Sequence, residues 1–138
     1  MGPEALAALH ARAFTRLRPW SAGEFTELLQ SPLVFLCPAP NAFALGRVVA
    51  DEAELLTLAT DPGHRRTGQG AACLNAFETQ ALIRGAIRAF LEVDSENRAA
   101  LRLYETAGYQ TSTRRKHYYA LPGGQRADAI VMVKPLQH

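Results

Sequence analysis

The order of secondary-structure patterns predicts one α/β (α+β) domain spanning residues 1–138. Helical and strand patterns alternate along the chain without an internal repeat or a linker long enough to separate two domains. A glycine-rich loop joins a short apolar strand to an apolar helix, as in many α/β proteins. Hydrophobic residues make up 48% and charged residues 20% of the 138, so the chain can form one folded core.

The first two elements are predicted to be helices. From Pro3 to about Leu17, apolar side chains recur on one helical face, and Pro19 ends this pattern. Ser21 and Glu24 have the spacing of a capping box, in which each side chain accepts a hydrogen bond from the main-chain N–H of the other. They start a second helix, which we expect to end before Pro32.

Three strands are predicted to follow as a meander. Apolar runs at Leu33–Cys37 and Ala42–Ala50 are separated by Pro38–Asn41, whose prolines and asparagine are typical of a turn. The run Glu54–Thr60 continues the meander as a third strand.

The remaining elements continue the alternation. A helix from Ala71 is expected to end at Gly85, and Ala86–Val93 is the next predicted strand. Asn97–Ala107 is predicted to form a short helix that stops at a glycine. Tyr109–Tyr119 and Ala127–Val133 are predicted to be two strands joined through a glycine-rich turn.

The loop after the third strand has the composition of a phosphate-binding loop. The sequence Asp61-Pro62-Gly63 ends the strand, and Arg65-x-x-Gly68-x-Gly70 leads into the helix. Glycine lets the backbone approach a ligand closely, and the unpaired N–H groups and the dipole at a helix start favour an anion. These residues favour a loop that holds a pyrophosphate.

Two common nucleotide-binding loops do not fit this segment. After Gly63 and Gly68, a P-loop would continue with Lys and Ser or Thr to bind the outer phosphates and magnesium, but the chain has Gln69 and Gly70. The dinucleotide fingerprint requires a small residue where Cys73 stands. A glycine-rich turn that only links strand and helix remains the alternative to a phosphate site.

Two ionisable residues are candidates for chemistry. Leu91 and Val93 are expected to share one face of their strand, so Glu92 points to the other face as a general base or as an ordinary solvent-facing carboxylate. Tyr104 lies on the helix face that packs toward the sheet. Its hydroxyl needs a partner there, and it can act as an acid if it reaches a cleft.

The charges do not require a nucleic-acid partner. The formal net charge is only +2, although Arg65–Arg66 and Arg114–Lys116 form local basic clusters that could meet phosphates. Solvation of the surface accounts for most of these charges. We therefore expect no direct binding to nucleic acid.

The sequence also predicts no metal site, disulfide or membrane span. Cys37 and Cys73 stand in apolar surroundings and are expected to be reduced core residues. No apolar run approaches the roughly 18 residues that span a bilayer, so the cytoplasm is the expected location. The four histidines lack the spacing of metal ligands: His10, His64, His117 and His138.

Several separated motifs together resemble the GNAT acetyltransferase superfamily and, within it, the RimI-type enzymes. The resemblance runs from about residue 4 to residue 134. The glycine loop and the motif at Ser95–Tyr104 mark the superfamily, whereas the first motif and the last two narrow the match to the RimI type. The motifs are Pro19-Trp20-Ser21, Arg65-x-x-Gly68-x-Gly70, Leu91-Glu92-Val93, Ser95-Glu96-Asn97-x-Ala99-Ala100-x-x-Leu103-Tyr104, Arg115-Lys116-His117-Tyr118-Tyr119 and Asp128-Ala129-Ile130-Val131-Met132.

This resemblance implies a GNAT fold, with a mixed, mostly antiparallel sheet of about six strands flanked by about four helices. It implies acetyl-CoA as the co-substrate, no metal, and direct attack of an amine on the thioester. Glu92 would be the base, through water, and Tyr104 the acid. The acetyl-CoA-binding residues it implies are Leu58, Ala59, Thr60, Arg65, Arg66, Thr67, Gly68, Gln69, Gly70, Ala71, Asn97 and Tyr104.

The acceptor is less narrowly defined than the cofactor. The resemblance implies the N-terminal amine of a ribosomal protein that starts with alanine, while a small amine such as a polyamine or an antibiotic, or a noncatalytic CoA-binding module, are the alternatives. Family members usually have a strand before the first helix, so the first edge strand is expected to be missing or supplied by another chain. Both a monomer and a homodimer are compatible with this expectation, and no membrane partner is expected.

Overall fold

The structure is a computed structural model that describes residues 1–137, and His138 lies outside the described residues. A six-stranded mixed sheet forms the centre of the protein. The strand order is β1-β2-β3-β4-β6-β5, and every neighbouring pair is antiparallel except the parallel pair β3 and β4. The strands are β1 (Val34–Ala39), β2 (Ala42–Val49), β3 (Glu52–Thr60), β4 (Arg88–Asp94), β5 (Gln110–Ala120) and β6 (Arg126–Pro135).

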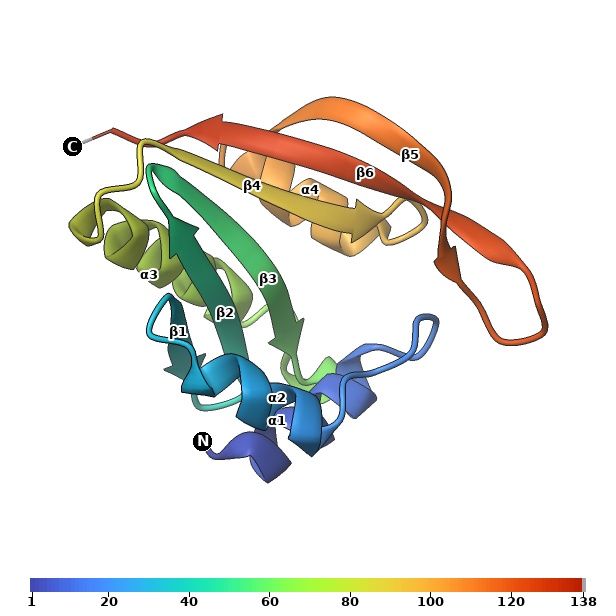
Figure 1. Cartoon of the computed structure of the whole chain (residues 1–138). Coiled ribbons are helices and arrows are strands. Elements are labelled where there is room, and N and C mark those ends of the chain that lie inside the picture. The colour runs from blue at the N-terminus through green and yellow to red at the C-terminus, as the bar shows by residue number, and fades with distance from the viewer. Residues whose placement is uncertain (138) are drawn as a thin grey trace.

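Four helices cover the two faces of the sheet, as Figure 1 shows. α1 (Pro3–Ala13) and α2 (Ala22–Gln30) lie on one face, whereas α3 (Gln69–Ile83) and α4 (Arg98–Thr106) lie on the other. A short 3₁₀ turn, η1 (Pro62–His64), precedes α3. The architecture confirms the predicted mixed sheet with its flanking helices, and most predicted elements have ends within two residues of the observed ones.

The first helix is shorter than predicted, because it ends at Ala13 rather than near Leu17. Phe14 already has an extended backbone, with φ −107° and ψ 93°. The residue before a proline is disfavoured in the helical region, so Arg18 could not continue the helix into Pro19. Residues 14–19 instead form a loop, and this loop becomes one wall of the candidate site.

The second helix begins as predicted. Ser21 Oγ accepts a hydrogen bond from the Glu24 main-chain N–H at 3.2 Å, and Glu24 Oε1 accepts one from the Ser21 N–H at 3.0 Å. This capping box satisfies N–H groups that the helix itself cannot pair. The Arg18 guanidinium adds a bidentate contact to the Glu24 carboxylate at 2.8 and 2.9 Å.

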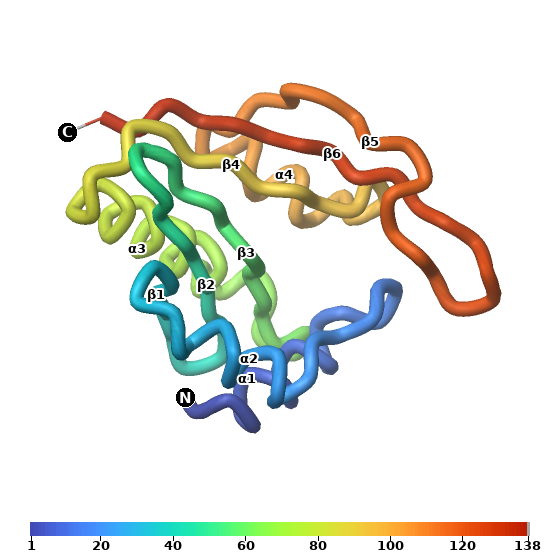
Figure 2. Tube along the Cα trace, viewed as in Figure 1, coloured from blue at the N-terminus to red at the C-terminus, as the bar shows by residue number. Residues whose placement is uncertain are grey.

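A β-bulge in β3 opens the sheet. Leu45 pairs with Thr57 and Gly46 pairs with Leu55, so Leu56 is an extra residue without a partner on β2. Pairing between β3 and β4 covers only the start of the two strands and ends at Leu55 and Leu91. Because a bulge increases the local twist, β3 turns away from β4 beyond this point, and Figure 2 shows the two strands diverging.

Two buried clusters hold the helices against the sheet. The cluster on the α3 and α4 face includes both cysteines, which are free and buried as predicted. Gly46 permits the closest packing there, because a β-carbon at this position would lie 2.6 Å from Phe35 Cζ and 2.6 Å from Phe77 Cδ1. The cluster on the other face joins α1 and α2 to the sheet through Leu6, Leu9, Phe25, Val34, Phe43, Leu45 and Ala59.

Candidate active site

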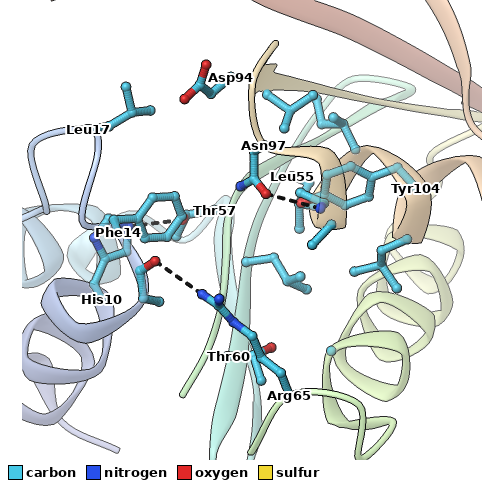
Figure 3. Close-up of a pocket in the computed structure, with 18 of the residues that line it drawn as sticks. His10, Phe14, Leu17, Leu55, Thr57, Thr60, Arg65, Asp94, Asn97 and Tyr104 are labelled. Carbon is cyan, nitrogen blue, oxygen red and sulfur yellow. Dashed lines mark hydrogen bonds between the residues drawn. The ribbon is translucent and has the colours of Figure 1, made fainter. Parts of the chain in front are cut away.

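The diverging strands border a cavity of about 890 Å³. Its walls come from the ends of β3 and β4, the loop before α3, the start of α4, and the loop between α1 and α2. Figure 3 shows side chains from both sides of the opening facing this space, with His10 and Phe14 on one side and Asn97 and Tyr104 on the other. A groove of this size and composition is typical of a small-molecule site.

The loop before α3 presents main-chain N–H groups to one end of the cavity. Asp61 Oδ1 accepts from the Gly63 N–H at 3.0 Å and begins the turn, and Arg66 and Gly68 then adopt positive φ angles of 66° and 82°. Gly68 is the N-cap of α3 and has no side chain to cap the helix. The N–H groups of the first turn of α3 therefore have no side-chain cap and are available to an anion.

Gly70 lets the helix start lie close to the strand. A β-carbon at this position would be 3.1 Å from Thr60 Oγ1 and 3.7 Å from Leu103 Cδ2. The glycine thus lets the first turn of α3 lie against the end of β3 and close to α4. The Arg65 guanidinium donates to the Ala13 carbonyl at 3.4 Å and so reaches the end of α1.

The cavity collects most of the residues that the sequence singled out for acetyl-CoA. Ala59 and Thr67 are not part of its lining: the Ala59 side chain is buried on the α1 face, and the Thr67 hydroxyl donates to the His64 carbonyl at 2.6 Å. Asn97 Oδ1 accepts from the Ala100 N–H at 3.2 Å, so this residue caps α4 while also lining the cavity. The predicted residues in the lining are Leu58, Thr60, Arg65, Arg66, Gly68, Gln69, Gly70, Ala71, Glu92, Asn97 and Tyr104.

Glu92 lines the cavity from β4 and is only partly buried, whereas its neighbours Leu91 and Val93 are buried in the core, as strand alternation predicts. Its side chain is 23% exposed, and Oε2 lies 3.5 Å from Arg115 Nε on β5. This Oε2 atom is buried and has no hydrogen bond from residues 1–137. A desolvated carboxylate oxygen with unused acceptor capacity can take a proton from a cationic ligand.

Tyr104 projects from α4 toward the same cavity (Figure 3). The side chain is only 6% exposed, and its ring meets the Tyr109 ring edge to face at a centroid distance of 6.0 Å. Burial raises the pKa of the Tyr104 phenol above its usual range, and the nearby Tyr119 raises it further. The hydroxyl is therefore protonated at neutral pH and can donate a hydrogen bond to a developing anion.

Tyr119, Asp94 and Arg16 also line the cavity but were not among the predicted site residues. Burial and then the charge of Glu92 raise the pKa of Tyr119, with smaller contributions from Tyr118 and Asp94. Asp94 could have been found from the sequence, because it follows Glu92 by two positions and must share its strand face. Arg16 was not identified because the first helix was predicted to continue to about Leu17, whereas α1 ends at Ala13 and Arg16 lies in the loop after it.

His10 is a buried neutral histidine beside this cavity. Its Nδ1 accepts a hydrogen bond from the Trp20 main-chain N–H at 3.0 Å, so the ring proton is on Nε2, which donates to Thr57 Oγ1 at 3.1 Å. The ring also stacks on Phe14 at 4.1 Å. Burial lowers the pKa of His10 to about 4, against a raising effect of Glu24.

The low pKa of His10 predicts a loss of stability in mild acid. A group with a lowered pKa in the folded state contributes stability above its unfolded pKa of 6.5, and this contribution falls as the pH drops toward 4. The free energy of unfolding is expected to fall by about 2 kcal/mol between pH 7 and pH 5 through this residue. Urea unfolding at both pH values measures the change.

The matched control for that measurement is His10→Gln, which cannot titrate in this range. Its stability is expected to be lower at pH 7 but to change much less toward pH 5. Equal pH slopes for the variant and the unaltered protein would show that His10 is not the titrating group.

No group of three or more His, Cys, Asp or Glu side chains is placed to hold a metal ion within residues 1–137. None of the helices in this part of the chain is long and apolar enough to cross a membrane. The polar groups that line the cavity include the carboxylates of Glu92 and Asp94, the phenols of Tyr104 and Tyr119, several guanidinium groups and main-chain N–H groups. These groups suit the binding of an anion and the transfer of protons.

A match to a known protein family accompanies these features of the cavity. Residues 7–109 match the acetyltransferase (GNAT) family. The chain therefore belongs to the GNAT family of acetyltransferases.

Two curated relatives narrow the comparison. The chain is 36% identical over 134 residues to the [ribosomal protein bS18]-alanine N-acetyltransferase of Escherichia coli (strain K12), covering 94% of this chain and 90% of that protein. It is 33% identical over 135 residues to the N-alpha-acetyltransferase RimI of Mycobacterium tuberculosis, covering 91% and 82% of the two proteins.

Solved structures show the same architecture. The crystal structure of the ribosomal-protein-S18-alanine N-acetyltransferase from Escherichia coli superposes with a TM-score of 0.85 at 34% identity, covering 99% of this chain and 88% of that one. Ard1 from Thermoplasma volcanium superposes with a TM-score of 0.84 at 21% identity and covers 99% and 92%, which shows that the fold is shared.

Proposed function

We propose that this protein transfers the acetyl group of acetyl-CoA to the N-terminal α-amine of a protein that begins with alanine, with a ribosomal protein in the cytoplasm as acceptor. The observation that carries the proposal is that Glu92 and Tyr104 line one cavity together with the uncapped start of α3. The names of the 36% and 33% identical relatives support the choice of acceptor.

The cavity fits a long, anionic co-substrate. Main-chain N–H groups between Arg65 and Ala71 would hold the pyrophosphate, since the N-cap residue Gly68 has no side chain to cap this helix start. Leu58 and Thr60 are two positions apart, so their main-chain groups face the same edge of β3, and β4 does not pair with β3 beyond Leu55. This free edge can bind the amide groups of a pantetheine chain, with Asn97 on the opposite wall.

The roles of the two side chains follow from the chemistry of acyl transfer. Acetyl-CoA supplies a thioester whose carbonyl carbon is attacked by the amine, so a C–N bond forms and the C–S bond breaks. An α-amine with a pKa of about 8 is only about a tenth neutral at pH 7, so Glu92 removes its proton before attack. Tyr104 donates to the sulfur as the thiolate forms, and the Leu58 N–H can stabilise the oxyanion.

A turnover panel tests the proposal directly. Purified protein is incubated with acetyl-CoA and thiol release is measured with three acceptor classes, namely peptides with a free N-terminal alanine, lysine-containing peptides with blocked N-termini, and small amines. We expect kcat/KM to be highest for the free alanine termini, by at least about tenfold over the blocked peptides.

Each other result has a defined meaning. Turnover of small amines alone would keep the cofactor but overturn the protein acceptor. Binding of acetyl-CoA without turnover of any class would overturn the enzymatic proposal in favour of a CoA-binding module.

A further inference from the structure

Beyond Leu55 and Leu91 the sheet divides into two arms, one formed by β3 with α1 and α2 packed on it and the other by β4 with β6 and β5. One ion pair joins the two arms at the end where β3 and β4 are not hydrogen-bonded. Arg16 Nε donates to Asp94 Oδ2 at 2.6 Å, between the α1–α2 loop and the last residue of β4. The two residues are 78 positions apart in the sequence. The contact therefore links the arm that carries α1 and β3 to the arm that carries β4, where the backbone no longer connects them.

Other ion pairs around the cavity stay within one arm. Arg12 pairs with Asp61 at 3.1 Å and so ties α1 to the end of β3. Arg18 pairs with Glu24 and ties the α1–α2 loop to its own second helix. Neither contact limits the distance between the α1–α2 loop and β4.

Because Asp94 is buried, breaking its ion pair with Arg16 is costly in free energy. The Asp94 side chain is only 5% exposed, whereas that of Arg16 is 45% exposed. Asp94 Oδ1 accepts from the Glu96 main-chain N–H at 3.1 Å, which leaves Arg16 as the charged partner of Oδ2. Separating Arg16 from the buried Asp94 carboxylate would leave that charge poorly solvated and without its ionic partner, so the carboxylate opposes any opening of this contact.

The segment that this pair holds forms the wall beside the proposed base. Phe14 and Leu17 of the α1–α2 loop line the cavity, and Figure 3 shows Leu17 and Asp94 at the same end of it. Glu92 and Asp94 are two positions apart on β4 and face the same side of the strand. The loop is thus fixed beside Glu92, where the proposed function places the acceptor amine.

We propose that the Arg16–Asp94 ion pair is a latch that holds the α1–α2 loop against β4 and thereby shapes the acceptor end of the cavity. Arg16 and Asp94 are positioning residues: they act through the loop on the binding of the acceptor and leave the chemistry of Glu92 and Tyr104 unchanged. The acceptor part of this inference rests on the proposed function.

Kinetics of Arg16→Gln separate this role from a general effect on the enzyme. We expect the KM for an alanine-starting peptide to rise about tenfold, with kcat and the KM for acetyl-CoA within about threefold of the unaltered protein. Arg16→Lys keeps the charge and is expected to recover most of the lost affinity. The double variant Arg16→Gln/Asp94→Asn is expected to be no worse than the worse single variant, because both remove the same contact.

Arg88→Gln is the matched control. Arg88 pairs with Glu52 at 3.1 Å and also joins β3 to β4, but at the closed end, where the strands are hydrogen-bonded. Both of these side chains are about half exposed, and Arg88 is not part of the cavity lining. Its removal is expected to leave the acceptor KM unchanged.

Limited trypsin digestion tests the latch without any turnover. The Arg16–Leu17 bond lies in the loop, and its rate of cleavage reports how often the loop leaves β4. Asp94→Asn keeps this cleavage site and is expected to be cut there at least about fivefold faster than the unaltered protein, with the cut identified by mass spectrometry.

Unchanged acceptor KM in Arg16→Gln together with unchanged cleavage in Asp94→Asn would overturn the latch. Failure of the unaltered protein to acetylate any peptide would overturn the proposed function instead, and the cleavage rates would still decide whether the loop is latched.

Discussion

Tyr104→Phe is expected to lower kcat about 100-fold while leaving the protein folded. The substitution removes only the hydroxyl that would donate to the leaving thiolate, and it keeps the buried ring that packs on Tyr109 at 6.0 Å. The KM for acetyl-CoA is expected to stay within about threefold, because the pyrophosphate site is formed by the loop before α3. Steady-state thiol release and a thermal melt measure both parts of the prediction.

Tyr109→Phe is a close control for that variant. Tyr109 is also buried and next to α4, but it does not line the cavity, and its hydroxyl has no hydrogen bond from residues 1–137. Its turnover is expected to remain near that of the unaltered protein. Full activity in Tyr104→Phe would leave Tyr104 as a packing residue only.

Glu92→Gln is expected to produce the second large loss, about 100-fold in kcat/KM for the acceptor at pH 7. Glutamine keeps the shape of the side chain but cannot take a proton from the substrate ammonium. The deficit should shrink above pH 8, where the α-amine is largely neutral without a base. A pH profile of kcat/KM from pH 6 to pH 9 distinguishes this behaviour from a loss of binding.

Glu96→Gln provides the control, since Glu96 follows the same strand but is exposed and lies outside the cavity lining. Its pH profile is expected to match that of the unaltered protein. A Glu92→Gln deficit that is constant over the whole pH range would exclude Glu92 as the base and assign it to acceptor binding.

Sequence patterns predicted the elements that depend on local chemistry. The capping box at Ser21 and Glu24 and the glycine loop before α3 are visible in the sequence because their residues are neighbours. Strand alternation likewise placed Glu92 on the face away from the core. Each of these features is decided by a few consecutive residues.

Contacts between distant segments were not accessible in this way. The link between Arg16 and Asp94 spans 78 residues, and no periodic pattern relates a loop to the end of a strand. His10 lies on the apolar face of a predicted helix, but its partners Trp20 and Thr57 are known only once α1 has packed on β3. The ion pair of Glu92 with Arg115 also requires the order of β4, β6 and β5 in the sheet.

The bulge at Leu56 shows that the position of the cavity depends on β3 having one residue more than β2 at this point. Before the bulge, Ala53 and Leu55 face α3; after it, Ala59 faces the α1 side and Thr57 meets His10 there. Deleting Leu56 would restore regular alternation with Thr57 still opposite Leu45, remove the extra twist and allow β4 to pair further along β3. Substitutions that change the side chains of this strand can leave the cleft intact, whereas the deletion of a single codon at the bulge would close it.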